Sequence, residues 1–389
     1  MKKSFALLLA TLMLFAAGCG GSPPPAPVTA PDPAPPAATD PSTPDLADAL
    51  TLDTIRIAFI YGGDPSDMGF NYRQHQGVLG MIRNLNLRDD QILNTFNITP
   101  GSATDTALME SIEWGADMVF GLTFAFEPHF IEAARQHPDV LFFHNTGNQA
   151  LASGLPNMHN YFGNMSQARY LSGIAAGLRT ETNVLGFVAA HPFAEVITGF
   201  TAYFLGARSV NPDVRMYVMY TNSWNDPTLE QQVTQALVDR GADVIGQHAN
   251  SPSTQTAAES AGVWGIGYNN DMLGAAPNAF LTAPMFDWSV YMTMAVESVI
   301  AGQPVPNDWI GGLNEGVVVL VDFNPLTIAP GTEEAIASAE AELRAGRNVF
   351  TGPIYDINGN QLLAAGEEFV EPLSAPSWTH IIEGIVVVE

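Results

Sequence analysis

The segment Ile55-Arg-Ile-Ala-Phe-Ile-Tyr-Gly-Gly-Asp-Pro-Ser-Asp-Met-Gly-Phe-Asn-Tyr-Arg-Gln-His-Gln-Gly77 decides the fold class of this chain. Its first seven residues are mostly apolar and include β-branched isoleucines, as in a strand buried inside a parallel sheet. The glycines and proline at 62–65 end that strand, and apolar residues from Val78 onward predict a helix near 70–86. A loop between such a strand and helix is where open α/β sheets bind ligands.

The same alternation of strand and helix continues along the chain and then restarts. The first series has predicted strands at 55–61, 92–97, 117–122 and 140–145, with helices near 70–86, 103–114 and 127–136. The second has strands at 184–190, 214–220, 242–246 and 263–268, with helices at 193–209, 227–240 and 253–261. Two βα series of similar length predict an α/β protein with two lobes, each a parallel sheet flanked by helices.

The predicted domains follow from these two series. Residues 280–286 and the helix after them return to the first lobe, and 309–323 read as a strand crossing and a hairpin. The expected boundaries are 51–163 and 281–308 for lobe 1, 164–280 and 309–350 for lobe 2, and 351–389 for a C-terminal extension.

The amino terminus is typical of an exported lipoprotein. Residues 1–18 have two lysines, an apolar run and small residues before Cys19, the only cysteine. Ala16-Ala-Gly-Cys19 resembles a bacterial lipobox, which predicts a signal peptide, lipidation of Cys19 and attachment to the outer face of the cell membrane. The alternative is an ordinary signal peptide that leaves a free thiol. Residues 19–50 form a Pro-rich tether, either a stalk or a leader without function.

Composition and motifs exclude several classes of function. The net charge of −26 repels nucleic acids and other polyanions. The histidines lack metal-ligand spacing, and the chain has neither a Gly-x-Ser-x-Gly elbow nor a phosphate-binding loop. We therefore expect no enzyme, no cofactor and no metal, and we expect a monomer.

Polar and aromatic loops follow most of the predicted strands. Because carboxyl ends of the strands in two lobes face each other across a cleft, these loops predict a ligand site. Phe70 and Trp224 are expected to hold the faces of a flat ring. Further ligand-binding candidates are Asn71, Phe124, Asn145, Glu195, His248, Tyr268, Asn270 and Asp271.

Several candidates also have a structural explanation. A phenylalanine in a loop is often part of the packing. Glu195 and His248 are alternatively solvated or hydrogen-bonded locally. Tyr268, Asn270 and Asp271 alternatively cap and close a turn.

From about residue 52 onward the chain resembles the basic membrane lipoprotein family of ABC-transporter substrate-binding proteins. The resemblance rests on Asp67-Met-Gly-Phe-Asn, Tyr170-Leu-Ser-Gly-Ile-Ala-Ala, Gly186-Phe-Val, Gly206-Ala-Arg-Ser-Val-Asn-Pro-Asp-Val, Gly241-Ala-Asp-Val-Ile and Phe350-Thr-Gly-Pro-Ile-Tyr-Asp-Ile-Asn-Gly-Asn with Glu383-Gly. It implies a two-lobed periplasmic-binding-protein type I fold with a hinge of crossing strands. It also implies purine bases or nucleosides as ligands and ABC permease subunits as partners.

One departure from the family pattern concerns the ligand. Nucleoside-binding members carry a lysine in the segment corresponding to Thr282-Ala-Pro-Met-Phe-Asp, whereas this chain has no lysine after residue 3. The resemblance is therefore to the branch that takes a free purine base such as adenine. A ligand sensor with the same fold and, less favoured, an exported nucleoside hydrolase are the alternatives.

Overall fold

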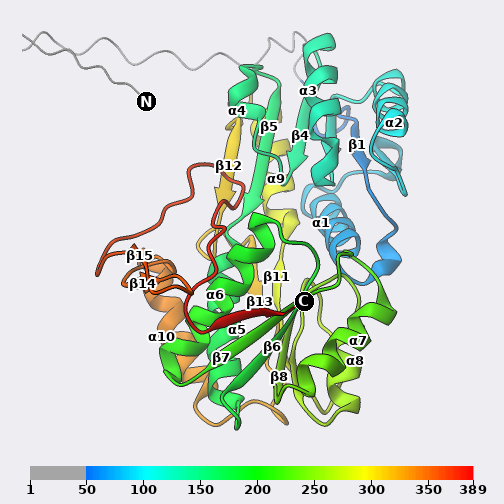
Figure 1. Cartoon of the computed structure of the whole chain (residues 1–389). Coiled ribbons are helices and arrows are strands. Elements are labelled where there is room, and N and C mark those ends of the chain that lie inside the picture. The colour runs from blue at the N-terminus through cyan, green and yellow to red at the C-terminus, as the bar shows by residue number, and fades with distance from the viewer. Residues whose placement is uncertain (1–49, 389) are drawn as a thin grey trace, which may run out of the picture. The chain divides into compact units, whose positions relative to one another are not determined.

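The computed structural model describes residues 50–388, which form two six-stranded parallel sheets (Figure 1). The predicted signal peptide, Cys19 and the tether up to residue 49 lie outside the described residues. The α/β fold class with two parallel sheets flanked by helices is confirmed.

The first sheet has the strand order β12-β5-β4-β3-β1-β2, and all its strand pairs are parallel. Its strands are β1 Ile57–Ile60, β2 Ile92–Thr95, β3 Met118–Gly121, β4 Leu141–Asn145, β5 Met158–Gly163 and β12 Asp308–Gly311. Its helices are α1 Phe70–Leu85, α2 Ser102–Glu113, α3 Glu127–Gln136, α4 Ala150–Ser153 and α9 Trp288–Ile300.

Strand β1 is apolar along its whole length because helices cover both faces of the sheet. Ile57 and Phe59 belong to the core that contains residues of α1 and α9, whereas Ala58 and Ile60 belong to the core under α2 and α3. Burial on both faces requires a continuous apolar run rather than an alternating one, and this run is what identifies β1 in the sequence.

The second sheet has the order β10-β9-β8-β6-β7-β16 and is also parallel throughout. Its strands are β6 Val184–Ala189, β7 Arg215–Tyr220, β8 Val244–His248, β9 Trp264–Ile266, β10 Phe280–Thr282 and β16 Ile385–Val388. Its helices are α5 Met165–Arg179, α6 Ala194–Val210, α7 Pro227–Val238, α8 Ser253–Ser260 and α10 Thr332–Arg344.

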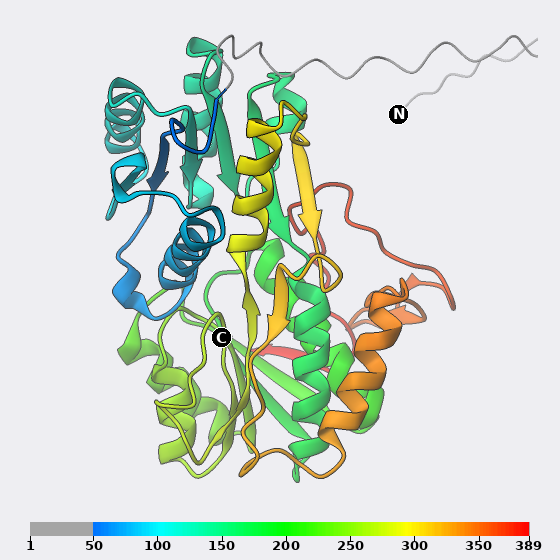
Figure 2. The same ribbon diagram turned by 180° about the vertical axis from the view of Figure 1, so that it is seen from behind.

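The chain crosses between the two lobes through short strands (Figure 2). After β10 in the second sheet, β11 (Pro284–Phe286) leads into α9, which packs on α1 in the first lobe. After β12 the chain returns through β13 (Val318–Leu320), which pairs antiparallel with β11. These crossings form the hinge of crossing strands implied by the family resemblance.

Two edge strands, β12 and β16, extend the sheets beyond the residue ranges predicted for the two lobes. β12 extends the first sheet past residue 308 by pairing with β5. β16, in the segment predicted as an extension, pairs with β7 in the second sheet. Between α10 and β16, strands β14 (Ile354–Tyr355) and β15 (Gln361–Leu363) form a small hairpin.

Candidate ligand-binding site

The two lobes touch at the start of α1. A Cβ atom placed on Gly69 would overlap the backbone carbonyl oxygen and the Cα atom of Asn250, in the loop after β8. Such contact between two backbones is possible only at a glycine. The structure is therefore a closed arrangement of the lobes at this point.

Asp67 fixes the loop that leads into α1. One of its carboxylate oxygens accepts hydrogen bonds from the backbone N–H groups of Gly69 and Tyr72, each at 2.9 Å. The other oxygen accepts from the backbone N–H of Asn71 at 3.0 Å and from its Nδ2 at 2.9 Å. Phe70 and Asn71 are thus held at the helix start, immediately beside the contact between the lobes.

Trp224 lies on the lobe 2 side of the same contact. Its carbonyl oxygen accepts a hydrogen bond of 2.9 Å from the backbone N–H of Asn250, the residue that touches Gly69. The residue is 36% exposed, and its ring is near those of His191, Phe193 and His248, with centroid distances of 5.0, 5.9 and 6.0 Å. An exposed indole beside an interlobe contact has a face available to a ligand.

Glu195, His248 and Tyr268 come together at the carboxyl ends of the second sheet. Glu195 is in the first turn of α6, and its Oε1 lies 3.5 Å from Nε2 of His248 at the end of β8. The rings of His248 and Tyr268 are 4.6 Å apart. Burial lowers the pKa of His248, and the neighbouring Glu195 opposes this effect only in part. His248 is therefore neutral at neutral pH.

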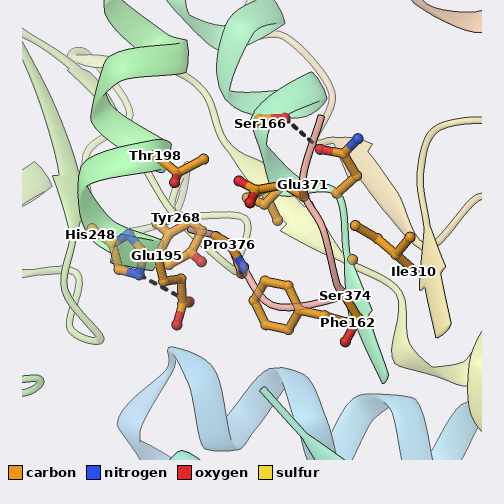
Figure 3. A pocket seen from close by; sticks show the side chains of 14 residues that line it. Phe162, Ser166, Glu195, Thr198, His248, Tyr268, Ile310, Glu371, Ser374 and Pro376 are labelled. Atoms are coloured by element: carbon orange, nitrogen blue, oxygen red, sulfur yellow. Dashed lines mark hydrogen bonds and ion pairs between the residues drawn. The ribbon is translucent and has the colours of Figure 1, made fainter. Parts of the chain in front are cut away.

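These three residues line a small cavity of about 20 Å³ (Figure 3). About 10–15 Å³ of such volume holds one water molecule, so the cavity accommodates the edge of a ring rather than a whole base. The remaining lining residues come from the end of β5 and the start of α5, from α6, from β12 and from the C-terminal segment: Phe162, Gly163, Asn164, Met165, Ser166, Thr198, Gly199, Ile310, Glu371, Ser374 and Pro376.

The sequence analysis does not include the C-terminal segment in the site, although Glu371, Ser374 and Pro376 line the cavity. The backbone N–H and the hydroxyl of Ser374 donate to the carboxylate of Asp308 at 2.8 and 2.6 Å, which holds the segment against β12. Burial raises the pKa of Glu371 next to the cavity. No local motif marks these residues, because they reach the cavity only through the tertiary fold.

Other predicted site residues lie elsewhere. Asn145 is fully buried; its Oδ1 accepts a 2.8 Å hydrogen bond from Gln74, and its Nδ2 donates to a backbone oxygen. Phe124 is 56% exposed after β3. Asn270 is buried but does not line the cavity, and Asp271 accepts from the backbone N–H of Leu273, as in a turn cap.

The described residues contain neither a metal cluster nor a membrane-spanning helix. Between residues 50 and 388, no three His, Cys, Asp or Glu side chains are grouped so as to hold a metal ion. Within the same range, no helix has the length and apolarity needed to cross a bilayer.

Comparisons with known proteins identify relatives over most of the chain. The family model Bmp, described as ABC transporter substrate-binding protein PnrA-like, matches residues 54–341. A purine-binding protein of Brucella abortus is 31% identical over 320 residues, covering 81% of this chain and 89% of that protein. A putative ABC transporter glucose-binding protein of Haloferax volcanii is 30% identical, covering 80% and 78%.

The fold agrees with a solved structure. A solute-binding protein of an ABC transporter from Conexibacter woesei superposes with a TM-score of 0.64. The match covers 75% of this chain and 97% of that one at 20% identity, so the likeness concerns the fold alone.

Proposed function

Because the chain belongs to the Bmp family of PnrA-like ABC transporter substrate-binding proteins, we propose that it captures a purine base between its lobes and delivers it to an ABC permease. The observation that supports this proposal is the contact between the backbones of Gly69 and Asn250, because Phe70 follows Gly69 and Trp224 is hydrogen-bonded to Asn250. We expect a base held by these two rings to have its edge near Glu195 and His248, since the rings of Trp224 and His248 are 6.0 Å apart. The Brucella relative, named a purine-binding protein, supports the same ligand class.

The proposal is tested by calorimetry on protein freed of bound ligand by unfolding and refolding. Adenine is expected to bind more tightly than adenosine, since no lysine stands beside the crossing strands to hold a ribose. Glucose, the ligand in the name of the Haloferax relative, is the matched competitor. Tight binding of glucose with no binding of any purine contradicts the proposal.

Delivery to a permease depends on closure of the lobes around the ligand. We expect Gly69→Ala to weaken purine binding by about tenfold, since a methyl group there overlaps backbone atoms of Asn250 and overpacking costs about 1–3 kcal/mol. Calorimetry measures the effect. Gly154→Ala is the control for the effect of a glycine-to-alanine change far from the interlobe contact. Gly154 lies at an exposed turn where a Cβ atom would meet no atom within 4 Å, and its positive φ adds only local strain. Unchanged affinity in Gly69→Ala means that the closed contact is not part of the bound state.

We also propose that Cys19 is lipidated and anchors the protein at the outer face of the membrane. Cys19→Ser removes the acylated thiol, so the protein is expected to leave the membrane fraction or to accumulate as an uncleaved precursor. Phase separation in detergent, followed by mass determination, distinguishes these outcomes. A serine variant that is processed normally and still enters the detergent phase is incompatible with the lipid anchor.

A further inference from the structure

Arg169, in α5, is a fully buried cation that lies against Tyr268, one of the residues lining the cavity. Its Nη1 donates a 2.8 Å hydrogen bond to the carbonyl oxygen of Gln247, and its guanidinium carbon lies 3.8 Å from the centre of the Tyr268 ring. Within residues 50–388 no carboxylate lies within 4.0 Å of its guanidinium, although the charge of Glu195 and the Tyr268 hydroxyl act on it. Its Nε and Nη2 have no partner with hydrogen-bond geometry. A buried donor without a partner is costly, so these groups indicate a place for an acceptor.

The free Nε of Arg169 points to the same small space as the free Nδ1 of His248. A Cβ atom placed on Gly199, in α6, would lie 3.5 Å from each of these nitrogens. Apart from adjacent parts of its own helix, it would meet no other atom within 4 Å. Gly199 and His248 both line the cavity. We call Arg169, Gly199 and His248 the Gly199 niche.

The niche offers a hydrogen-bond donor beside an acceptor. Arginine stays protonated, so Arg169 Nε always donates. His248 is neutral, and the carboxylate of Glu195 at 3.5 Å from Nε2 favours the proton on that nitrogen (Figure 3). Nδ1 is then left with its lone pair. The partner that fits both groups presents an acceptor next to an N–H.

We propose that the Gly199 niche reads the N3/N9–H edge of a free purine base, with N3 accepting from Arg169 and N9–H donating to His248. This rests on the proposed function and makes it more specific. A nucleoside has its sugar at N9, so it lacks the donor. The cavity of about 20 Å³ has no room for that sugar. The niche therefore selects the unsubstituted base.

Two measurements by calorimetry test the inference on the mature full-length protein. In the wild type, 9-methyladenine is expected to bind about tenfold or more weakly than adenine, because the methyl group removes the donor to His248. In Gly199→Ala, adenine is expected to bind about tenfold or more weakly because the methyl group fills the niche. In the same variant, the affinities for adenine and 9-methyladenine are expected to differ by less than about threefold.

The alanine variant also reports on folding. Its Cβ meets neighbours at an ordinary 3.5 Å, and alanine favours a helix more than glycine does, so its melting temperature should stay unchanged or rise. Weaker adenine binding without a loss of stability supports the niche. If the variant does not fold, the comparison of adenine with 9-methyladenine in the wild type still tests whether the niche binds the N3/N9–H edge.

The contradicting outcomes separate the inference from the proposed function. Wild-type protein that binds adenine and 9-methyladenine equally, or Gly199→Ala that binds adenine as tightly as the wild type, overturns the niche and leaves purine binding intact. Wild-type protein that binds no purine overturns both.

Discussion

Trp224→Ala is expected to weaken purine binding by about 5- to 150-fold. Stacking of a base on an aromatic side chain is worth about 1–3 kcal/mol, and about 1.4 kcal/mol corresponds to a factor of ten. Trp224 is 36% exposed next to the interlobe contact, so it has surface to offer a ligand. Calorimetric titration of adenine into ligand-free protein measures the change.

Two further variants make the result interpretable. Phe70→Ala, from the other lobe, is expected to have a similar effect, and the double variant need not be additive because both rings would touch one base. Phe193→Ala removes a more exposed ring beside Trp224 and is the matched control, with an expected change of less than about threefold. Unchanged affinity in Trp224→Ala contradicts the placement of the ligand between the two rings.

Gly206→Ala is expected to destabilise the protein by about 3 kcal/mol or more. Gly206 in α6 faces the backbone of α5, where a Cβ atom would overlap the carbonyl oxygen of Tyr170. Gly173 in α5 faces the carbonyl oxygen of Tyr203 in the same way. Overpacking usually costs about 1–3 kcal/mol, and here neither backbone can yield without separating the two helices. Urea unfolding followed by fluorescence measures the loss.

Gly199→Ala is the matched control for this prediction, because it makes the same substitution in the same helix without a close contact. It is expected to keep the wild-type stability or to gain up to about 1 kcal/mol from helix propensity. Equal stability of Gly206→Ala and the wild type would contradict the close packing of α5 on α6.

The sequence by itself determined the fold class and the positions of most strands and helices. A run such as Ile57–Ile60 is apolar on both faces because helices cover both sides of the sheet, and this condition is visible in a few consecutive residues. The start of α1 at Phe70 is likewise local, since Asp67 binds the backbone N–H groups that follow it.

The sequence also predicted which loops hold the ligand site, but not where each side chain in them points. Asn145 and His248 both end a buried strand. Asn145 turns to Gln74 in the core of its own lobe, whereas His248 lines the cavity. The difference depends on partners in other elements, which no local pattern records.

Only the tertiary structure decided the edges of the sheets and the composition of the cavity. β16 pairs with β7, a strand that precedes it by more than 160 residues in the sequence. The segment before β16 brings Glu371 and Ser374 to the cavity. Arg169 and Gly199, on two different helices, meet His248 because glycines let α5 and α6 pack closely. Periodicity is set by neighbours along the chain, whereas a buried polar site is set by which distant elements pack together. This is why the sequence predicted the strands and helices but not the positions of Arg169, Gly199, Glu371 and Ser374.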